Sequence, residues 1–152
     1  MDPFLDLYEM IGALARRRHQ DAERVFSSIG MNHTEARLLT LLHKGGGVAT
    51  QDTLANQLFV DRSNAGRALK RLEADGYVAR SKDDADKRAN LVGMTAKGRA
   101  AVRAIGRFRK RLAKEFFHAL DDKEADRLAA LLRKTLGDDG PETPTRRHAR
   151  GR

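Results

Sequence analysis

The segment TQDTLANQLFVDRSNAGRALKRLEADG, residues 50–76, decides the fold of this chain. Thr50 and Asp61 are residue types that cap helix N-termini, and Gly76 is the type that ends a helix. Apolar residues between them recur at helical spacing: Leu54, Ala55, Leu58, Ala65, Leu69 and Leu72. The pattern predicts a short helix over 51–59, a turn at 59–60 and a longer helix over 61–75, which is the order of a helix-turn-helix.

The flanking segments extend this order. Two predicted strands, 77–80 and 89–94, follow the longer helix, and the charged turn 81–88 joins them as a hairpin. A helix over 33–44, opened by the capping box of Asn32 and Glu35, precedes the triple glycine 45–47 and a very short strand at 48–49. We therefore expect a mainly α fold with a small β-hairpin wing, a winged helix-turn-helix.

Long amphipathic helices are predicted on both sides of this unit. They cover residues 4–29, 96–119 and about 122–136, and each carries an apolar stripe. A small winged unit cannot cover all three stripes, so we expect a second copy of the chain to do so. Residues 138–152 are dominated by Gly, Pro, Thr and Arg, a composition that predicts a disordered tail.

Composition narrows the function. The chain has 152 residues with a formal net charge of +9, and such a basic chain most often meets nucleic acid or another polyanion. It has no cysteine, which excludes thiolate metal sites, a Cys nucleophile and a thiol redox sensor. It has no run of ~20 apolar residues to span a membrane. No Ser-His-Asp pattern, P-loop or dinucleotide fingerprint occurs, so we expect no enzyme.

Polar residues occupy the positions of the longer helix that would meet bases. They are Arg62, Ser63, Asn64 and Arg67. Asn can bond an adenine edge and Arg a guanine edge in the major groove. Gly66 costs the helix ~1 kcal/mol relative to alanine, and close approach of the backbone to DNA would explain it. The alternative is a row of ordinary polar residues on a solvated face.

The segments just described resemble the MarR family, the bacterial multiple antibiotic resistance regulators, over roughly residues 30–100. The matching positions are Leu54-Ala55, Val60-Asp61-Arg62-Ser63, Leu69, Leu72-Glu73, Asp75-Gly76-Tyr77-Val78, Arg80, Asp86-Lys87-Arg88-Ala89 and Met94-Thr95-Ala96-Lys97-Gly98. The resemblance implies a dimer, with domains 1–30 (N-terminal dimerisation helix), 31–95 (winged helix-turn-helix), 96–137 (C-terminal dimerisation helices) and the tail 138–152.

The resemblance also implies contacts with DNA. Arg88 at the hairpin tip would enter the minor groove, where a narrow groove attracts guanidinium groups, and Asp86 would hold it. A surface ion pair is the alternative for these two residues. Thr50 and Gln51 would meet phosphate at a helix N-terminus or serve only as caps. Lys82 and Lys87 would contact phosphates or remain solvated.

A small-molecule pocket between the dimer helices and the winged unit is implied as well. Tyr8, Phe26, His33 and Arg37 are its candidate residues, with core or surface positions as the alternative. In the family the ligands are often phenolic or aromatic acids. His19, His33 and His118 could converge on a metal, but we expect no metal and no cofactor.

The sequence thus predicts a dimeric, sequence-specific transcriptional regulator that binds double-stranded DNA at a palindromic operator. We expect a repressor relieved by a small aromatic or phenolic effector, in the bacterial cytoplasm at the nucleoid, with no membrane partner. An architectural DNA-binding protein without an effector and a metal-responsive regulator are the alternatives. Residues 97–115 hold eight Lys or Arg and one acidic residue, Glu115. This basic segment either contacts DNA phosphates or only improves solubility.

Overall fold

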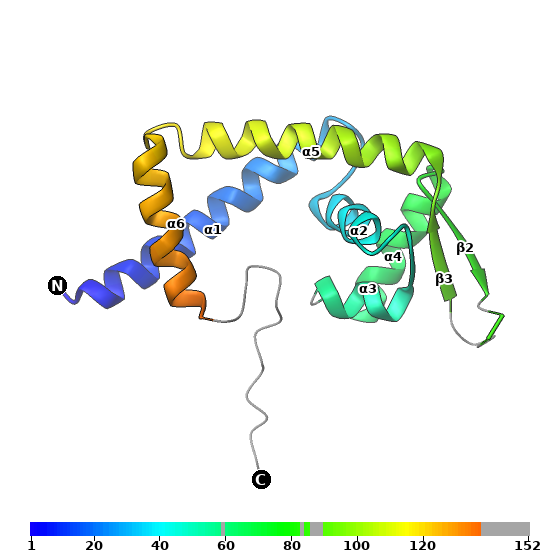
Figure 1. Ribbon diagram of the computed structural model, residues 1–152. Helices are drawn as coiled ribbons and strands as arrows, with labels where there is room; N and C mark the ends of the chain where they lie inside the picture. Colours follow the sequence, from blue (N-terminus) through cyan, green and yellow to red (C-terminus); the bar gives the residue numbers. More distant parts are fainter. Residues whose placement is uncertain (59, 83, 86–89, 138–152) are drawn as a thin grey trace, which may run out of the picture.

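The computed structural model in Figure 1 describes residues 1–58, 60–82, 84–85 and 90–137. Its elements, in chain order, are α1 (Pro3–Ser27), α2 (His33–Lys44), β1 (Val48–Thr50), α3 (Gln51–Leu58), α4 (Arg62–Ala74), β2 (Val78–Lys82), β3 (Asn90–Met94), α5 (Ala96–Phe116) and α6 (Asp122–Leu136). This is the winged helix-turn-helix order, so the predicted fold class is confirmed. The tail 138–152 lies outside the described residues.

Side-chain caps fix where the helices begin. The Asp2 carboxylate accepts from the Phe4 N–H at 2.8 Å at the start of α1. At α2, Asn32 Oδ1 accepts from the Glu35 N–H at 2.8 Å, and Glu35 Oε2 accepts from the Asn32 N–H at 3.1 Å. Each cap satisfies a backbone donor that has no partner within its helix, which is why these starts could be predicted.

The sheet has three antiparallel strands in the order β1-β3-β2. Val48 pairs with Gly93 and Val78 with Met94. Ser81 and Lys82, predicted in the turn, continue β2 and pair with β3. β2 is therefore longer than the sequence predicted, and β1, which pairs with β3, ties the wing to α2 and α3.

The core lies inside the winged unit, which consists of α2, α3, α4 and the sheet, and beneath the part of α5 that packs on this unit. Its largest fully buried apolar side chains come from α2, α3, α4, β3 and α5: Leu38, Leu39, Leu42, Leu54, Leu69, Leu72, Val92 and Ile105. The buried carboxylate of Glu35 lies 3.2 Å from the Arg71 guanidinium, an ion pair that joins α2 to α4. Buried charges are normally paired in this way because an isolated one is costly.

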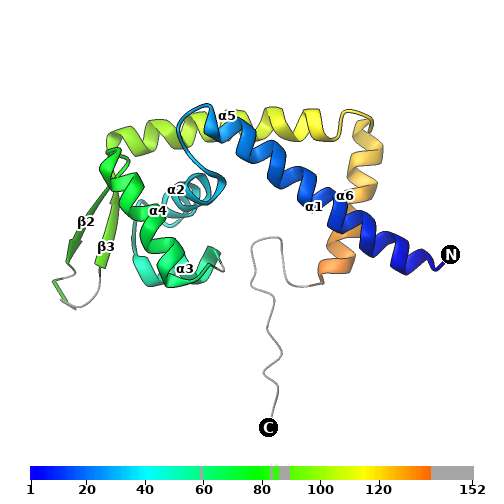
Figure 2. The same cartoon turned by 180° about the vertical axis from the view of Figure 1, so that it is seen from behind.

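The outer helices contribute little to this core. On α1 only Ala22 and Phe26 are buried, and α6 has no buried residue. Figures 1 and 2 show the amino-terminal half of α1 and the whole of α6 standing away from the winged unit. The predicted stripe on α1 is consequently exposed over its first half, including Phe4, Leu5, Tyr8 and Ile11.

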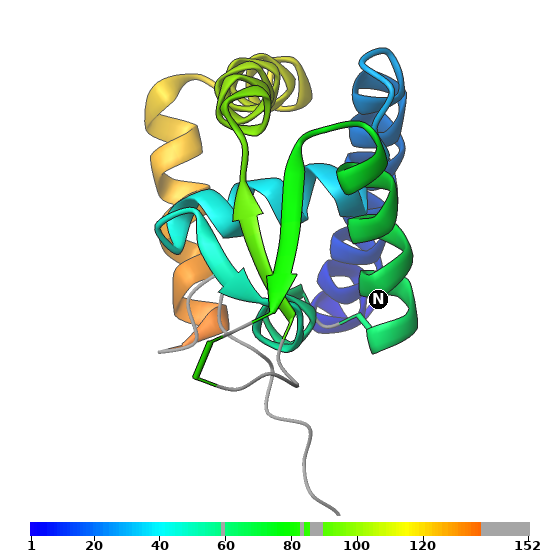
Figure 3. The same ribbon diagram turned by 90° about the vertical axis from the view of Figure 1, so that its right-hand side faces the viewer.

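α5 spans both parts of the molecule. It begins above the sheet and runs along one edge to α6, and Figure 3 views it end-on above α2. The amino-terminal end of α4 and the far end of the hairpin lie at the opposite edge. At Gly98 the start of α5 meets the chain before β2 so closely that an added Cβ would lie 2.2 Å from the Tyr77 carbonyl oxygen.

Candidate DNA-binding surface and ligand cleft

Helix α4 presents a polar row at its amino-terminal end. Asp61 caps the helix, its Oδ1 accepting from the Asn64 N–H at 2.7 Å. Arg62, Ser63, Asn64 and Arg67 are all exposed, while Ala65, Leu69 and Leu72 are buried on the other side. The short helix α3 packs against α4, and the four predicted base-reading residues lie on the accessible surface of α4.

In the free protein this polar row is held by its neighbours. The Arg62 guanidinium lies 3.3 Å from an Asp52 carboxylate oxygen, and the Asn64 amide donates to Asp61 Oδ2 at 3.1 Å. Arg67 donates to the Asn64 side-chain oxygen. These groups are exposed, so each contact contributes little to stability and can be exchanged for a base or a phosphate at small cost.

Thr50 and Gln51 have roles inside the protein. Thr50 Oγ1 accepts from the Thr53 N–H at 3.2 Å and thereby caps α3. Gln51 Oε1 accepts from the Arg80 guanidinium at 3.3 Å. An added Cβ at Gly66 would lie 3.3 Å from Gln51 Nε2, the movable end of a side chain, so a small shift of that amide would make room for it.

Arg80 is a positioning residue that sequence reasoning did not single out. Its backbone N–H and its Nε donate to Glu73 Oε2 at 3.1 and 3.4 Å, while its other end reaches Gln51. The guanidinium therefore links α3, α4 and β2 into one rigid support for the recognition helix. Its partners Gln51 and Glu73 both lie within residues 50–76, but nothing in the sequence indicates that they contact Arg80.

Of the wing residues predicted to contact DNA, Lys82 lies in the described part of the chain. The Lys82 ammonium donates to Asn90 Oδ1 at 3.2 Å, across the two strands of the hairpin. Asp86, Lys87 and Arg88, predicted for the tip, lie outside the described residues. Their contacts with the minor groove stay predictions.

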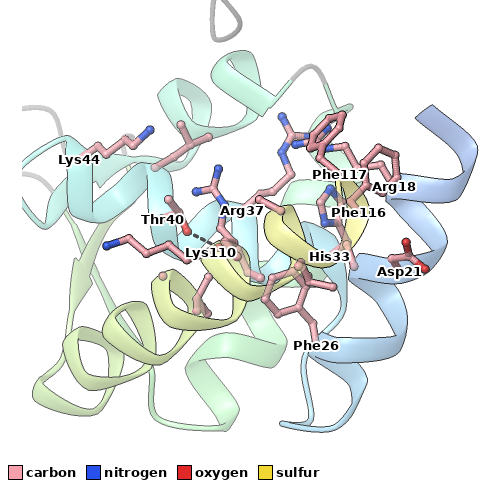
Figure 4. Close-up of a pocket in the computed structure, with 18 of the residues that line it drawn as sticks. Arg18, Asp21, Phe26, His33, Arg37, Thr40, Lys44, Lys110, Phe116 and Phe117 are labelled. Carbon is pink, nitrogen blue, oxygen red and sulfur yellow. Dashed lines mark hydrogen bonds between the residues drawn. The ribbon is translucent and has the colours of Figure 1, made fainter. Parts of the chain in front are cut away.

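A cleft of about 890 Å³ opens between α1, α2 and α5. Phe26, His33 and Arg37, three of the four predicted ligand residues, line it, and Figure 4 shows them in the same hollow. The fourth, Tyr8, is 75% exposed on the amino-terminal half of α1 and does not line the cleft. The structure thus separates Tyr8 from the other three within one copy of the chain.

The cleft wall combines cations and aromatic rings. Its cationic residues are Arg18, Arg37, Lys44, Arg109 and Lys110, and its aromatic rings are those of Phe26, Phe116 and Phe117, beside His33. Asp21 is the acidic residue of this wall, and its carboxylate lies 3.3 Å from Arg24 and 3.9 Å from Arg17. Arg18 and Arg109 were not predicted, because nothing in the sequence brings α1 and α5 to Arg37. Such a wall suits an anion with an aromatic body.

His33 is the unusual titratable group of the cleft. Burial, then the nearby charges of Arg37, His19 and Arg18, lower its pKa to about 4, against a smaller opposing effect of Glu23. Its Nδ1 is buried and has no hydrogen-bond partner among the described residues. Burial and the neighbouring guanidinium groups of Arg18 and Arg109 also lower the pKa of Arg37. At neutral pH the cleft therefore offers a neutral imidazole beside a guanidinium.

The described residues were also compared with the requirements of a metal site and of a membrane span, and they meet neither. No group of three or more His, Cys, Asp or Glu side chains there could hold a metal ion. The rings of His19 and His33 do meet edge to face, with 5.4 Å between centroids. In the same ranges, every helix is too short or too polar to cross a membrane.

The fold and the exposed polar helix define a DNA-binding protein of the winged helix-turn-helix class. The MarR family model matches residues 29–89. The structure is similar to wild-type MarR of E. coli without ligand, with a TM-score of 0.79 and 25% identity over 90% of this chain and 98% of that one. These two matches confirm the resemblance to the MarR family that the sequence shows.

Other relatives point to the same class. The uncharacterised HTH-type transcriptional regulator YybA of Bacillus subtilis is 24% identical over 129 residues, 85% of each chain. An organohalide-sensing regulator, RdhR, has been solved in a 2,4-dichlorophenol-bound form. It shares the fold of this chain, with a TM-score of 0.76 and 19% identity over 90% of this chain and 80% of that one. A MarR variant has been solved with operator DNA, with a TM-score of 0.75 and 25% identity over 90% of this chain and 100% of that one. This chain is accordingly a DNA-binding transcriptional regulator and not an enzyme.

Proposed function

We propose that the chain is a homodimeric repressor that binds a palindromic operator and leaves it when a small aromatic acid binds the cleft between α1, α2 and α5. The cleft carries this proposal. It joins guanidinium groups, aromatic rings and a neutral imidazole at the junction between the winged unit and the outer helices. The regulator would work at the bacterial nucleoid, in the cytoplasm.

Exposed apolar surface on the outer helices supports the dimer. The exposed large residues of α1 and α6 are Phe4, Leu5, Leu7, Tyr8, Met10, Ile11, Leu14, Leu131, Leu132 and Leu136. Large apolar side chains exposed in such number on two helices mark an interaction surface. A second copy would bury it and set two recognition helices side by side, with docking possible only when they lie about 34 Å apart.

The ligand class follows from the cleft wall. A carboxylate would pair with the Arg37 guanidinium, and an aromatic ring would pack among Phe26, Phe116 and Phe117. The unpartnered His33 Nδ1 can accept a hydrogen bond from a hydroxyl group beside the carboxylate. The dichlorophenol-bound relative shows that an aromatic ligand fits this fold, and it supports the same class here.

Ligand binding would reach the DNA through α2. This helix forms one wall of the cleft and also packs against α3 and α4. A ligand that holds α2 away from α1 and α5 would change the distance between the two recognition helices of the dimer. Its effect on DNA affinity equals its preference for the conformation that cannot dock.

The test is a titration of labelled DNA carrying a site selected from random sequence, with 2-hydroxybenzoate as the added ligand and matched salt as the blank. We expect saturable release from the wild type and at least about tenfold weaker response from Arg37→Gln, the loss expected for one charge-assisted contact. Lys123→Gln, which removes an exposed cation of α6, is the matched control.

Other results would contradict separate parts of this proposal. Release that follows ionic strength alone refutes the effector. Binding with no sequence preference favours the architectural protein, and release only on adding Zn²⁺ favours the metal-responsive regulator. Higher transcription from the operator in the presence of the free protein replaces repression with activation.

A further inference from the structure

A row of cations runs along the exposed face of α5. Arg99, Arg103, Arg107, Arg111 and Lys114 follow one another at intervals of four, four, four and three residues, and all are exposed. We call these five residues the α5 ridge. Residues at this spacing lie on one side of a helix, so the ridge is a band about 22 Å long at 1.5 Å per residue, and it winds by about 120° around the helix from Arg99 to Arg111.

The ridge lies opposite the buried face of α5. Ile105 and Gly98 are buried on the side that packs against the winged unit, and Ala101 and Phe108 lie partly buried beside them. Figures 1 and 2 show α5 at the edge of the molecule farthest from the amino-terminal end of α4 and the far end of the hairpin. The ridge therefore points away from the DNA that α4 would read.

Charge on α5 is segregated, which exposed helices normally avoid. Its one acidic residue, Glu115, lies 3.9 Å from Arg111. Arg103, Arg107 and Lys114 form no ion pair with any residue in the described ranges. Like charges four residues apart destabilise a helix. A row that alternates basic and acidic residues would keep the helix soluble without this cost. Helix α6 mixes both signs, with Asp122, Lys123, Glu124, Asp126 and Arg127 in its first turns.

From this placement we infer that the α5 ridge binds the phosphate backbone of a second DNA duplex while α4 occupies the first. A long band of evenly spaced cations matches a linear polyanion. Four of the five residues are arginines, whose guanidinium forks fit phosphate oxygens. The bound operator keeps neighbouring DNA at high local concentration, so a weak second contact suffices to bridge two segments.

Other polyanions fit the ridge less well. A membrane-surface helix needs an apolar face free to enter lipid, and that face of α5 is packed against the protein. An acidic protein partner would be met by a compact patch with apolar residues among the charges, as interfaces usually are. The ridge has a single line of charge, which suits a duplex.

The experiment measures bridging directly. A duplex with a selected site is fixed to beads and saturated with the full-length protein, and a soluble fluorescent 30-bp duplex of random sequence is added. We compare the wild type, Arg103→Gln/Arg107→Gln and the charge-matched control Lys123→Gln/Lys134→Gln. All four positions are exposed, and light scattering and circular dichroism check the assembly and folding of each protein.

The wild type and the control should capture the soluble duplex, and the ridge variant should capture about tenfold less at equal loading of the beads. The slope of log affinity against log salt for the captured duplex should fall by about 2, one for each lost phosphate contact. Wild-type protein that loads on the beads and captures nothing overturns the inference and leaves the proposed function intact. Equal capture by the ridge variant overturns it as well. Capture blocked equally by polyglutamate and by DNA would assign the ridge to acidic proteins instead.

Discussion

Replacing Gly98 by alanine tests the junction that attaches α5 to the winged unit. The new Cβ would lie 2.2 Å from the Tyr77 carbonyl oxygen and 2.8 Å from Met94 Cγ. The methionine can move, but the carbonyl belongs to the backbone at the start of the wing. Either α5 or the chain before β2 must therefore shift.

The expected cost follows from this geometry. Overpacking of a tight site costs about 1–3 kcal/mol, and the better helix propensity of alanine returns about 0.5–1 kcal/mol. Because the 2.2 Å contact is with a backbone atom, the overpacking cost lies in the upper part of this range, about 2–3 kcal/mol. The net loss is then about 1–2.5 kcal/mol, which lowers the Tm of a chain of this size by roughly 2–10 °C. The assay is thermal unfolding followed by circular dichroism at one fixed protein concentration, because a dimer's Tm depends on concentration.

Gly106→Ala is the matched control on the same helix. An added Cβ there meets nothing within 4 Å, so only the propensity gain remains. Its Tm should rise by roughly 1–4 °C, from about 0.5–1 kcal/mol. A Gly98→Ala protein as stable as the wild type, beside a stabilised control, would refute the close approach of α5 to the wing.

Three further predictions concern DNA, assembly and pH. Asn64→Ala should change the bases preferred in a binding-site selection, whereas Lys82→Ala should weaken binding to all sequences about equally; an unchanged selected motif for Asn64→Ala would count against base reading there. Leu128→Asp with Leu132→Asp should give aggregated or unfolded chain, since α6 would lose its partner, and a folded monomer in light scattering would contradict the dimer. Because the pKa of His33 is about 4 when folded and 6.5 in a model peptide, the unfolded chain binds more protons between these values. Stability should fall as pH drops from 6.5 to 4, and His33→Gln should flatten that part of the Tm profile.

Local chemistry explains which parts of the fold could be predicted. The helix starts at Asn32, Asp61, Thr95 and Asp121 follow from side chains within four residues of the backbone donors they satisfy. The buried faces of α3 and α4 follow from apolar spacing alone. Such signals are contained in short stretches of chain, so no knowledge of the tertiary structure is needed to use them.

The contacts that complete the sites are not local. Glu35 was recognised as a capping residue, but its burial against Arg71 depends on how α2 packs on α4. Gln51 and Arg80 are 29 residues apart, and their hydrogen bond exists only because the wing folds back beside α3. The cleft shows the same limit. His33 and Arg37 share one face of α2, whereas Arg18 and Arg109 reach the cleft from other helices.

In the proposed dimer, two copies of this chain place their α4 helices in successive major grooves of one operator. This arrangement can be checked by selecting bound sequences from a random duplex library and sequencing them. We expect an enriched palindrome whose half-sites lie about 10 bp, or one helical turn, apart from centre to centre. A selected pool with no enriched motif, or with a single unpaired half-site, would contradict it.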